Sequence, residues 1–179
     1  MHLQKTQCYP NCPTIQRKVT VGGLTKHQLL EALAKNTISM NTSAEMIFAS
    51  DLFATSKTQS TITTVELTVR NLGFPQGATI AEIYERAKQL ALNLCPLELG
   101  PHLRLQYLDQ PEGHIGKPVR KHQAPYGSIT IASQILTNDD NFPKGFYLRR
   151  VEGVLWLRGY RSGPPHVWEE DDHFVFATK

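Results

Sequence analysis

The sequence predicts an α+β fold in which N-terminal helices pack on a mostly antiparallel C-terminal sheet. Apolar residues recur at helical spacing before residue 96, strand-like segments separated by turn formers follow it, and "VEGV" is typical of a hairpin turn. The length of 179 residues fits one domain. We therefore expect an irregular arm over residues 1–17 and a single α+β domain over residues 18–179, helical over 24–95 and β-rich over 96–179.

The first half of the chain contains two strand candidates and two short helices. The strand candidates are residues 18–21, which two glycines end, and residues 61–74, in which Thr, Val and Ile dominate. "LTKHQLLEALAKN" predicts a helix with Thr25 as its N-cap, since leucines recur on one face. "NTSAEMIFASDLF" predicts a second helix, because Thr42 and Glu45 have the spacing of a capping box.

The most regular helix is expected from Thr79 to Leu94. Thr79 and Glu82 form a capping box, apolar residues follow at i, i+3, i+4 and i+7 spacing, and Pro96 limits any continuation. Cys95 would then lie at the C-terminal end of a helix, where the helix dipole disfavours a thiolate. We therefore expect Cys95 to be a buried structural thiol and not a nucleophile.

The second half of the chain contains five further strand candidates. They are Leu103–Leu108, Ser128–Leu136, Phe146–Val151, Val154–Arg158 and Phe174–Ala177. Gly153 can take the positive φ that a tight turn between the third and fourth of these strands needs. Residues 114–127 are expected to form a basic loop that contains proline and glycine.

The charge and hydropathy of the chain favour a cytoplasmic protein with no membrane partner. The formal net charge of +3 is too small to imply a nucleic-acid partner by itself. No stretch approaches the roughly 20 apolar residues that cross a bilayer. The N-terminal residues also lack the apolar run of a secretory signal.

Metal ligands are sparse, and we expect neither a metal nor a cofactor. Cys8 and Cys12 lie four residues apart and would supply half of a zinc site or a local disulfide. Zinc needs about two more ligands, which only the fold could bring close, so unpaired or locally paired cysteines are favoured. Residues 169–172 are all acidic, but on an extended segment alternate side chains point to opposite sides. At most two of these four would converge on a cation.

Residues 94–113, "LCPLELGPHLRLQYLDQPEG", and the later "DDHFVF" form a distinctive pattern. From about residue 62 to its end, the chain resembles a group of small uncharacterised bacterial proteins that share this pattern, with residues 114–127 as an insertion. The resemblance implies no established activity. Some members are labelled helicases, but this sequence lacks the Gly-x-x-x-x-Gly-Lys-Ser/Thr loop that cradles phosphates.

Strand alternation predicts a surface that combines arginine and aromatic side chains. It places Tyr147 and Arg149 on one face of their strand, and Trp156 and Arg158 on one face of the next. Such a surface suits a flat or anionic ligand. We therefore expect a non-catalytic binding module whose partner is a protein or an anionic ligand. Single-stranded nucleic acid is an alternative, because it binds through phosphate contacts and base stacking.

A further alternative is an enzyme of unrecognised class, with its site where residues 104–110 meet the acidic C-terminal segment. Arg104 would hold an anion, and Gln110 follows Asp109 in the adjacent turn. The candidate bases and their histidine partners are Asp109, Glu112, His166 and His173. Arg104 and Asp109 either present this corner of the chain to a ligand or brace it, and the sequence favours bracing.

Overall fold

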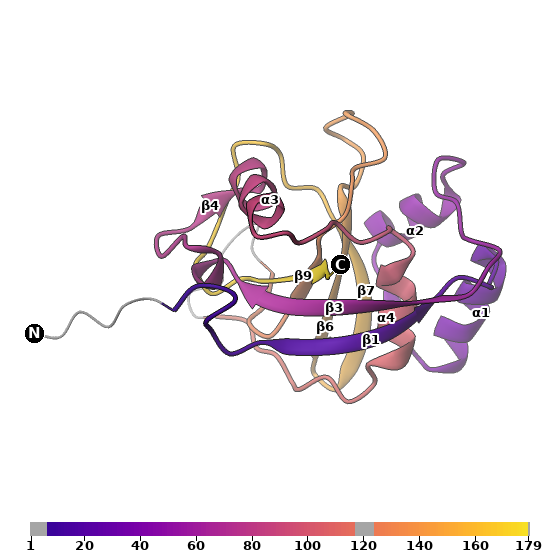
Figure 1. Ribbon diagram of the computed structural model, residues 1–179. Coiled ribbons are helices and arrows are strands. Elements are labelled where there is room, and N and C mark those ends of the chain that lie inside the picture. Colours follow the sequence, from indigo (N-terminus) through magenta and orange to yellow (C-terminus); the bar gives the residue numbers. More distant parts are fainter. Residues whose placement is uncertain (1–6, 117–123, 179) are drawn as a thin grey trace, which may run out of the picture.

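The computed structural model describes residues 7–116 and 124–178, which are built around a seven-stranded, mostly antiparallel sheet (Figure 1). The strand order is β1-β3-β9-β5-β6-β7-β2, and only the pairs β5–β9 and β2–β7 are parallel. The strands are β1 (Ile15–Val21), β2 (Ser39–Met40), β3 (Ser60–Thr68), β5 (Ile129–Ile131), β6 (Gly145–Val151), β7 (Val154–Tyr160) and β9 (His173–Ala177). The sheet is therefore not purely C-terminal, because β3 pairs with β9 and β1 pairs with β3 at one side of it.

Helices lie on both sides of the sheet. They are α1 (Lys26–Lys35), α2 (Thr42–Ala49), α3 (Ile80–Gln89), α4 (Leu99–Gln106) and the short 3-10 helix η1 (Arg70–Leu72). Figure 1 shows α1, α2 and α4 together on one side, while α3 lies apart from them. The small two-stranded sheet of β4 (Ala78–Thr79) and β8 (Val167–Trp168) adjoins α3. No helix in the described part of the chain is long and apolar enough to cross a membrane.

Two hydrophobic cores lie on opposite faces of the sheet. The first contains Phe146 and Leu148 of β6 and the buried residues of α1, α2 and α4. The second contains Phe174 and Phe176 of β9, residues of β3, and buried residues of α3. On this second face the core covers the β3–β9 half. The adjoining part of the same face, on β6 and β7, carries a different set of side chains.

The N-caps of the predicted helices agree with the sequence, except that of α2. Thr25 and Thr79 each accept a hydrogen bond from the third helical residue, in capping boxes with Gln28 and Glu82 respectively. The prediction of a capping box between Thr42 and Glu45 is wrong. Asn41 is the N-cap of α2, since its Oδ1 accepts the backbone N–H of Ala44 at 3.0 Å.

The predicted strand at Leu103–Leu108 is wrong, because most of this segment belongs to helix α4. Leu99 and Leu103 are four residues apart, and both are buried in the first core, as one face of a helix requires. Pro101 is tolerated because it lies in the first turn, where a backbone N–H has no partner within the helix. In this short segment the apolar residues therefore fit both the alternation of a strand and the four-residue spacing of a helix.

The helix that was expected to reach Leu94 ends at Gln89. Ala91 takes a left-handed conformation with φ of 59°, and the chain then runs extended beside the main sheet. Cys95 forms a single bridge with Ser133, so it does not lie at a helix end. It is nevertheless buried, and burial raises the pKa of its thiol to about 12, which agrees with a structural thiol. The predicted strand at Ser128–Leu136 is reduced to β5.

The hairpin between β6 and β7 is confirmed. Glu152 and Gly153 both have positive φ, of 54° and 74°, as a two-residue turn of type I′ requires. The turn fixes the register, since Val151 pairs with Val154 and every earlier residue of β6 then has a defined partner on β7. The strands predicted at residues 146–151 and 154–158 are thus present. The second of them, β7, extends two residues further, to Tyr160.

Two expected irregular segments are described only in part. Strand β1 begins at Ile15, inside the arm expected over residues 1–17, and pairs with β3 along its whole length. Within the loop expected over residues 114–127, His114 and Tyr126 form a single bridge and stack their rings with centroids 4.9 Å apart. Residues 1–6 and 117–123 of these predictions lie outside the described residues.

Gly159 allows α2 to approach β7 closely, and Gly159→Ala is expected to destabilise the protein by about 1–3 kcal/mol. A Cβ at this position would lie 2.7 Å from the backbone carbon of Ser43 and 2.8 Å from the backbone nitrogen of Ala44. Backbone atoms cannot move aside as a flexible side chain does. Urea unfolding measures the effect. The control is Gly163→Ala, whose Cβ would meet its nearest atom at 3.6 Å. Equal effects of the two substitutions would contradict this account.

Candidate ligand-binding site

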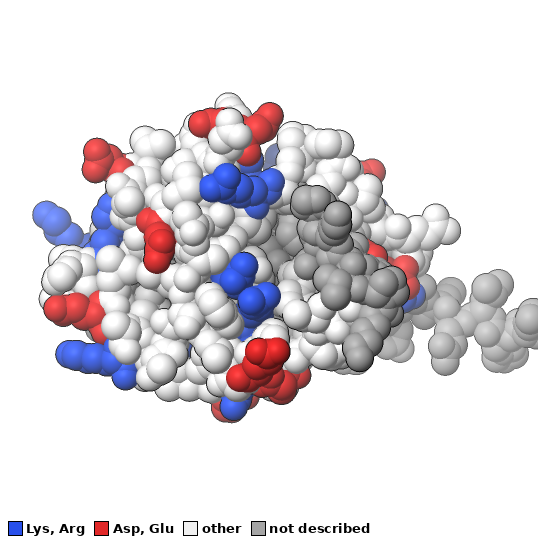
Figure 2. Space-filling model, turned by 180° about the vertical axis from the view of Figure 1, so that it is seen from behind, with Lys and Arg blue, Asp and Glu red and all other residues white. Residues whose placement is uncertain are grey.

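The second face of β6 and β7 carries the predicted arginine and aromatic side chains. The hairpin register pairs Tyr147 with Arg158 and Arg149 with Trp156, so all four residues share one face of the sheet. We call these four residues the Arg-aromatic face. Seen from behind in Figure 2, the molecule has Lys and Arg side chains gathered near the middle, beside a hollow.

The side chains of the Arg-aromatic face interact with one another. The guanidinium carbons of Arg149 and Arg158 lie 5.2 and 5.0 Å from the centroid of the Trp156 ring, which is cation–π distance. Arg158 also donates a hydrogen bond from Nε to the hydroxyl of Tyr147 at 2.8 Å. These contacts hold the two guanidinium groups against the sheet, so part of the ordering cost of binding an anion is already met.

The positive charge of this face is not neutralised within the described residues. No carboxylate among them forms an ion pair with Arg149 or Arg158. The Nε of Arg149 is buried and has no hydrogen-bond partner there. Burial, and then the charge of Arg158, lower the pKa of Arg149. Two neighbouring guanidinium groups without an acidic partner are a suitable arrangement for an anion.

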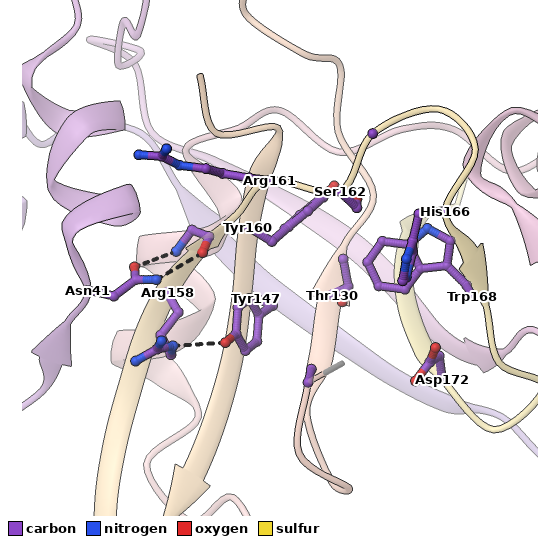
Figure 3. A pocket seen from close by; sticks show the side chains of 13 residues that line it. Asn41, Thr130, Tyr147, Arg158, Tyr160, Arg161, Ser162, His166, Trp168 and Asp172 are labelled. Carbon is purple, nitrogen blue, oxygen red and sulfur yellow. Dashed lines mark hydrogen bonds between the residues drawn. The ribbon is translucent and has the colours of Figure 1, made fainter. Parts of the chain in front are cut away.

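Two adjoining cavities lie over this face, with volumes of about 380 and 360 Å³. Tyr147, Arg158 and Asp172 line both, and Arg149 lines the second. Figure 3 shows the first cavity, with Arg158 and Arg161 on one side and Trp168 and Asp172 on the other. Cationic and acidic groups from distant parts of the chain therefore face one another across a space of ligand size.

The acidic wall comes from the segment between β8 and β9. Asp172 accepts the backbone N–H of Glu169 at 2.7 Å, which closes a turn and directs its carboxylate to the cavity wall. Burial, together with the negative charges of Glu169 and Asp171, raises the pKa of Asp172 to about 6. His166 lines the first cavity as well, and its ring packs edge-on against Trp168 at 5.1 Å. Asp172 is therefore a carboxyl group with a raised pKa that lines both cavities.

Asp172→Asn is expected to stabilise the protein by about 1–2 kcal/mol at pH 8 and to have little effect at pH 4. The folded-state pKa is above the ordinary value of 3.8, so the folded state binds this proton more tightly than the unfolded state. The ionised carboxylate lowers the free energy of unfolding. This loss of stability grows as the pH rises from about 4 and is complete above about 6. Urea unfolding at both pH values measures it, with exposed Asp51→Asn as control. A stability difference between Asp172→Asn and the wild type that does not change with pH would contradict the raised pKa of Asp172.

Arg104 and Gln110 lie elsewhere, inside the protein. Arg104 is fully buried and donates to Gln110 Oε1 at 2.6 Å and to the backbone carbonyls of Tyr107, Arg149 and Trp156. Burial lowers the pKa of Arg104 to about 10, which leaves it protonated at neutral pH. Gln110 donates in turn to two further backbone carbonyls. These two residues brace the corner that joins α4 to the β6–β7 hairpin.

The remaining candidate residues do not assemble into one site. Asp109 is exposed and lines neither cavity, and Glu112 accepts the backbone N–H of Gly153 at the hairpin turn. His173 lines the second cavity and pairs with Glu66 through Nδ1 at 2.8 Å. The catalytic arrangement that the sequence offered as an alternative, with Arg104 and Asp109 beside the acidic segment, is therefore not formed. In the described part of the chain, no three His, Cys, Asp or Glu side chains are grouped so that they could hold a metal ion.

Sequence reasoning missed several residues of the site. Thr130 and Asn41 line the first cavity, and only the sheet order brings them together. Asn41 could have been found, because an asparagine before an apolar helical repeat is a strong N-cap signal. Its side chain also exchanges two hydrogen bonds with the backbone of Gly159, at 2.8 and 3.0 Å, which fixes α2 at the cavity edge.

The chain was compared with protein-family models, with curated proteins and with solved structures, and nothing matches it. The resemblance of residues 94–113 to small bacterial proteins therefore stays a prediction. Within that segment, Arg104 and Gln110 form the buried brace and do not line the cavities. The interpretation of the site accordingly depends on its own geometry and charge.

Proposed function

We propose that this protein is a binding module that holds a small anionic ligand on its Arg-aromatic face. The observation that carries the proposal is the pair Arg149 and Arg158, which lie against Trp156 with no carboxylate partner in the described residues. A guanidinium group binds carboxylate or phosphate through two parallel hydrogen bonds. An indole ring adds a flat apolar surface beside the charge. The preferred ligand is thus an anion attached to a planar ring.

The size of the site favours a small molecule. The two cavities, of about 380 and 360 Å³, are within the range of ordinary small-molecule sites. The acidic wall, with Asp171 and Asp172, limits the cationic surface of the second cavity to Arg149 and Arg158, which is enough for one anionic group but not for the run of phosphates along a nucleic acid. Single-stranded nucleic acid and a protein partner are therefore the less favoured alternatives.

A titration with three related probes tests this proposal. Phenyl phosphate carries the ring and the anion, inorganic phosphate only the anion, and phenol only the ring. We expect phenyl phosphate to bind most tightly, phosphate more weakly and phenol least, in calorimetric titrations at low salt. A single-stranded oligothymidylate provides the nucleic-acid arm, for which affinity would fall steeply with salt. Equal binding of phenol and phenyl phosphate, or tight binding of the oligonucleotide alone, would contradict the proposal.

A second candidate function is acid–base catalysis in the same cavities, and Asp172 is its support. A carboxyl group with a pKa of about 6 can both donate and accept a proton near neutral pH. Arg158 would hold the anionic part of a substrate, and His166 lines the same cavity. An NMR titration of the Asp172 carboxyl carbon tests this candidate, with a midpoint near pH 6 expected. A midpoint below pH 4 would remove Asp172 as the acid.

A further inference from the structure

A third cavity, of about 430 Å³, is lined in part by α3 and differs in character from the two over the Arg-aromatic face. Its walls are mainly apolar and aromatic. They include Ile80, Tyr84, Leu94, Ile135, Tyr160 and Pro164. These residues come from α3, the segment after it, the segment after β5, and the end of β7 with the residues that follow. Ile135 remains 46% exposed, so apolar surface is accessible at this cavity.

The wall of this cavity includes a buried lysine, Lys144. Lys144 is only 8% exposed, and its Nζ donates to the backbone carbonyls of Asp139 at 2.8 Å and Thr137 at 3.5 Å. An ammonium group has three donors, and these neutral acceptors use two of them. No carboxylate in the described residues forms an ion pair with Lys144. Asp140, which also lines the cavity, is exposed to solvent.

A second polar group of the cavity wall is also buried. Ser133 is 1% exposed, and its hydroxyl has no hydrogen-bond partner in the part of the chain that the structure describes. This hydroxyl lies close to Gly145, the residue after Lys144, because a Cβ on Gly145 would meet Ser133 Oγ at 3.2 Å. A buried hydroxyl without a partner is costly, and a ligand oxygen would remove that cost.

We propose that this cavity binds a small amphiphile, an aliphatic or cyclic apolar body that carries one carboxylate. The apolar body would lie against Ile80, Leu94 and Ile135 and remove their surface from water. The carboxylate would complete the hydrogen bonding of Lys144, with Ser133 as a further donor on the wall. The site is separate from the Arg-aromatic face, although Tyr160 and Ser162 line both this cavity and the first one.

Calorimetric titration of the whole chain with octanoate, octanol and octylammonium tests the site. We expect octanoate to bind roughly tenfold more tightly than octanol, because it gains a charge-assisted hydrogen bond. Octylammonium should bind least, since it meets the charge of Lys144. Equal binding of octanoate and octylammonium, or no binding of octanoate, would overturn the proposal.

Three variants locate the binding. Lys144→Met should reduce octanoate binding to the level of octanol, and Ile135→Glu should weaken both ligands at least roughly tenfold. Ile135 is exposed, so its replacement tests the site even if Lys144→Met fails to fold. Leu52→Glu, at a residue that is 61% exposed and lines none of the three cavities, should leave both affinities unchanged.

A fourth variant separates this site from the proposed function. The double variant Arg149→Met, Arg158→Met should retain full octanoate affinity. Loss of octanoate binding in that variant, with binding retained in Ile135→Glu, would show that the octanoate site is the Arg-aromatic face and would overturn the inference.

Discussion

Arg104→Ala is expected to lower the free energy of unfolding by about 3–5 kcal/mol, the largest effect of any substitution considered for this chain. The arginine side chain is fully buried and donates to three backbone carbonyls and to Gln110. Its removal would leave these acceptors without their donor and would create a cavity where α4 meets β6 and β7. A buried polar group that loses its partner costs about 1–3 kcal/mol, and the cavity adds to this.

Urea unfolding of three variants measures the effect. Arg104→Lys keeps the charge but not the planar fork of donors, so it should destabilise less than Arg104→Ala and more than the control. The control is Arg86→Ala, an exposed arginine whose guanidinium carbon lies 5.6 Å from the centroid of the Phe74 ring. It should change stability by less than about 1 kcal/mol. If Arg104→Ala were no more destabilising than Arg86→Ala, Arg104 would not be the brace.

The double variant Arg149→Met, Arg158→Met is expected to weaken phenyl phosphate binding by at least roughly thirtyfold. Each charge-assisted hydrogen bond to an anion is worth about 1.5–3 kcal/mol, so the loss of even one produces an effect of this size. Methionine keeps an unbranched apolar stem beside Trp156, so the shape of the face changes little. Stability should change by no more than about 2 kcal/mol, because the two arginines lose cation–π contacts with Trp156 and one hydrogen bond to Tyr147, but no ion pair in the described residues.

Calorimetric titrations of the wild type, each single variant and the double variant measure this loss. Arg86→Met is the matched control, since it removes an arginine that also lies over an aromatic ring but lines none of the three cavities. Its affinity for phenyl phosphate should equal that of the wild type. A double variant that binds as tightly as Arg86→Met would place the anion elsewhere.

The Arg-aromatic face could be predicted because its geometry is local. Alternation along a strand assigns each side chain to a face, and the two-residue turn at Glu152 and Gly153 fixes the register of the hairpin. Together they place Tyr147 opposite Arg158 and Arg149 opposite Trp156. No long-range information is needed for this part of the site.

Helix α4 could not be predicted from the same kind of pattern. Leu103 and Leu105 alternate as in a strand, but Leu99 and Leu103 also have the four-residue spacing of a helix. Both patterns fit a segment of eight residues, and packing against the first core decides between them. The burial of Arg104 could not be predicted either, because two of its four acceptors come from the two strands of the β6–β7 hairpin.

The acidic wall depends on contacts far apart in the sequence. Asp172 faces Tyr147 and Arg158 only because β9 pairs with both β3 and β5 and brings the segment before it to the open half of the sheet. The sequence showed a run of acids beside histidines, but not which acid would line both cavities. The raised pKa of Asp172 likewise depends on its burial there and on the negative charges of Glu169 and Asp171, which outweigh the opposing effect of the hydrogen bond from the N–H of Glu169.

The most direct test of the Arg-aromatic face is an NMR titration of the ¹⁵N-labelled protein with phenyl phosphate, observing the Nε–Hε signals of its arginines. The account predicts saturable shifts at Arg149 and Arg158, with neighbouring shifts in the backbone amides of β6 and β7 and none at Arg86. Unchanged Arg149 and Arg158 signals under saturating phenyl phosphate, or shifts confined to other arginines, would contradict it.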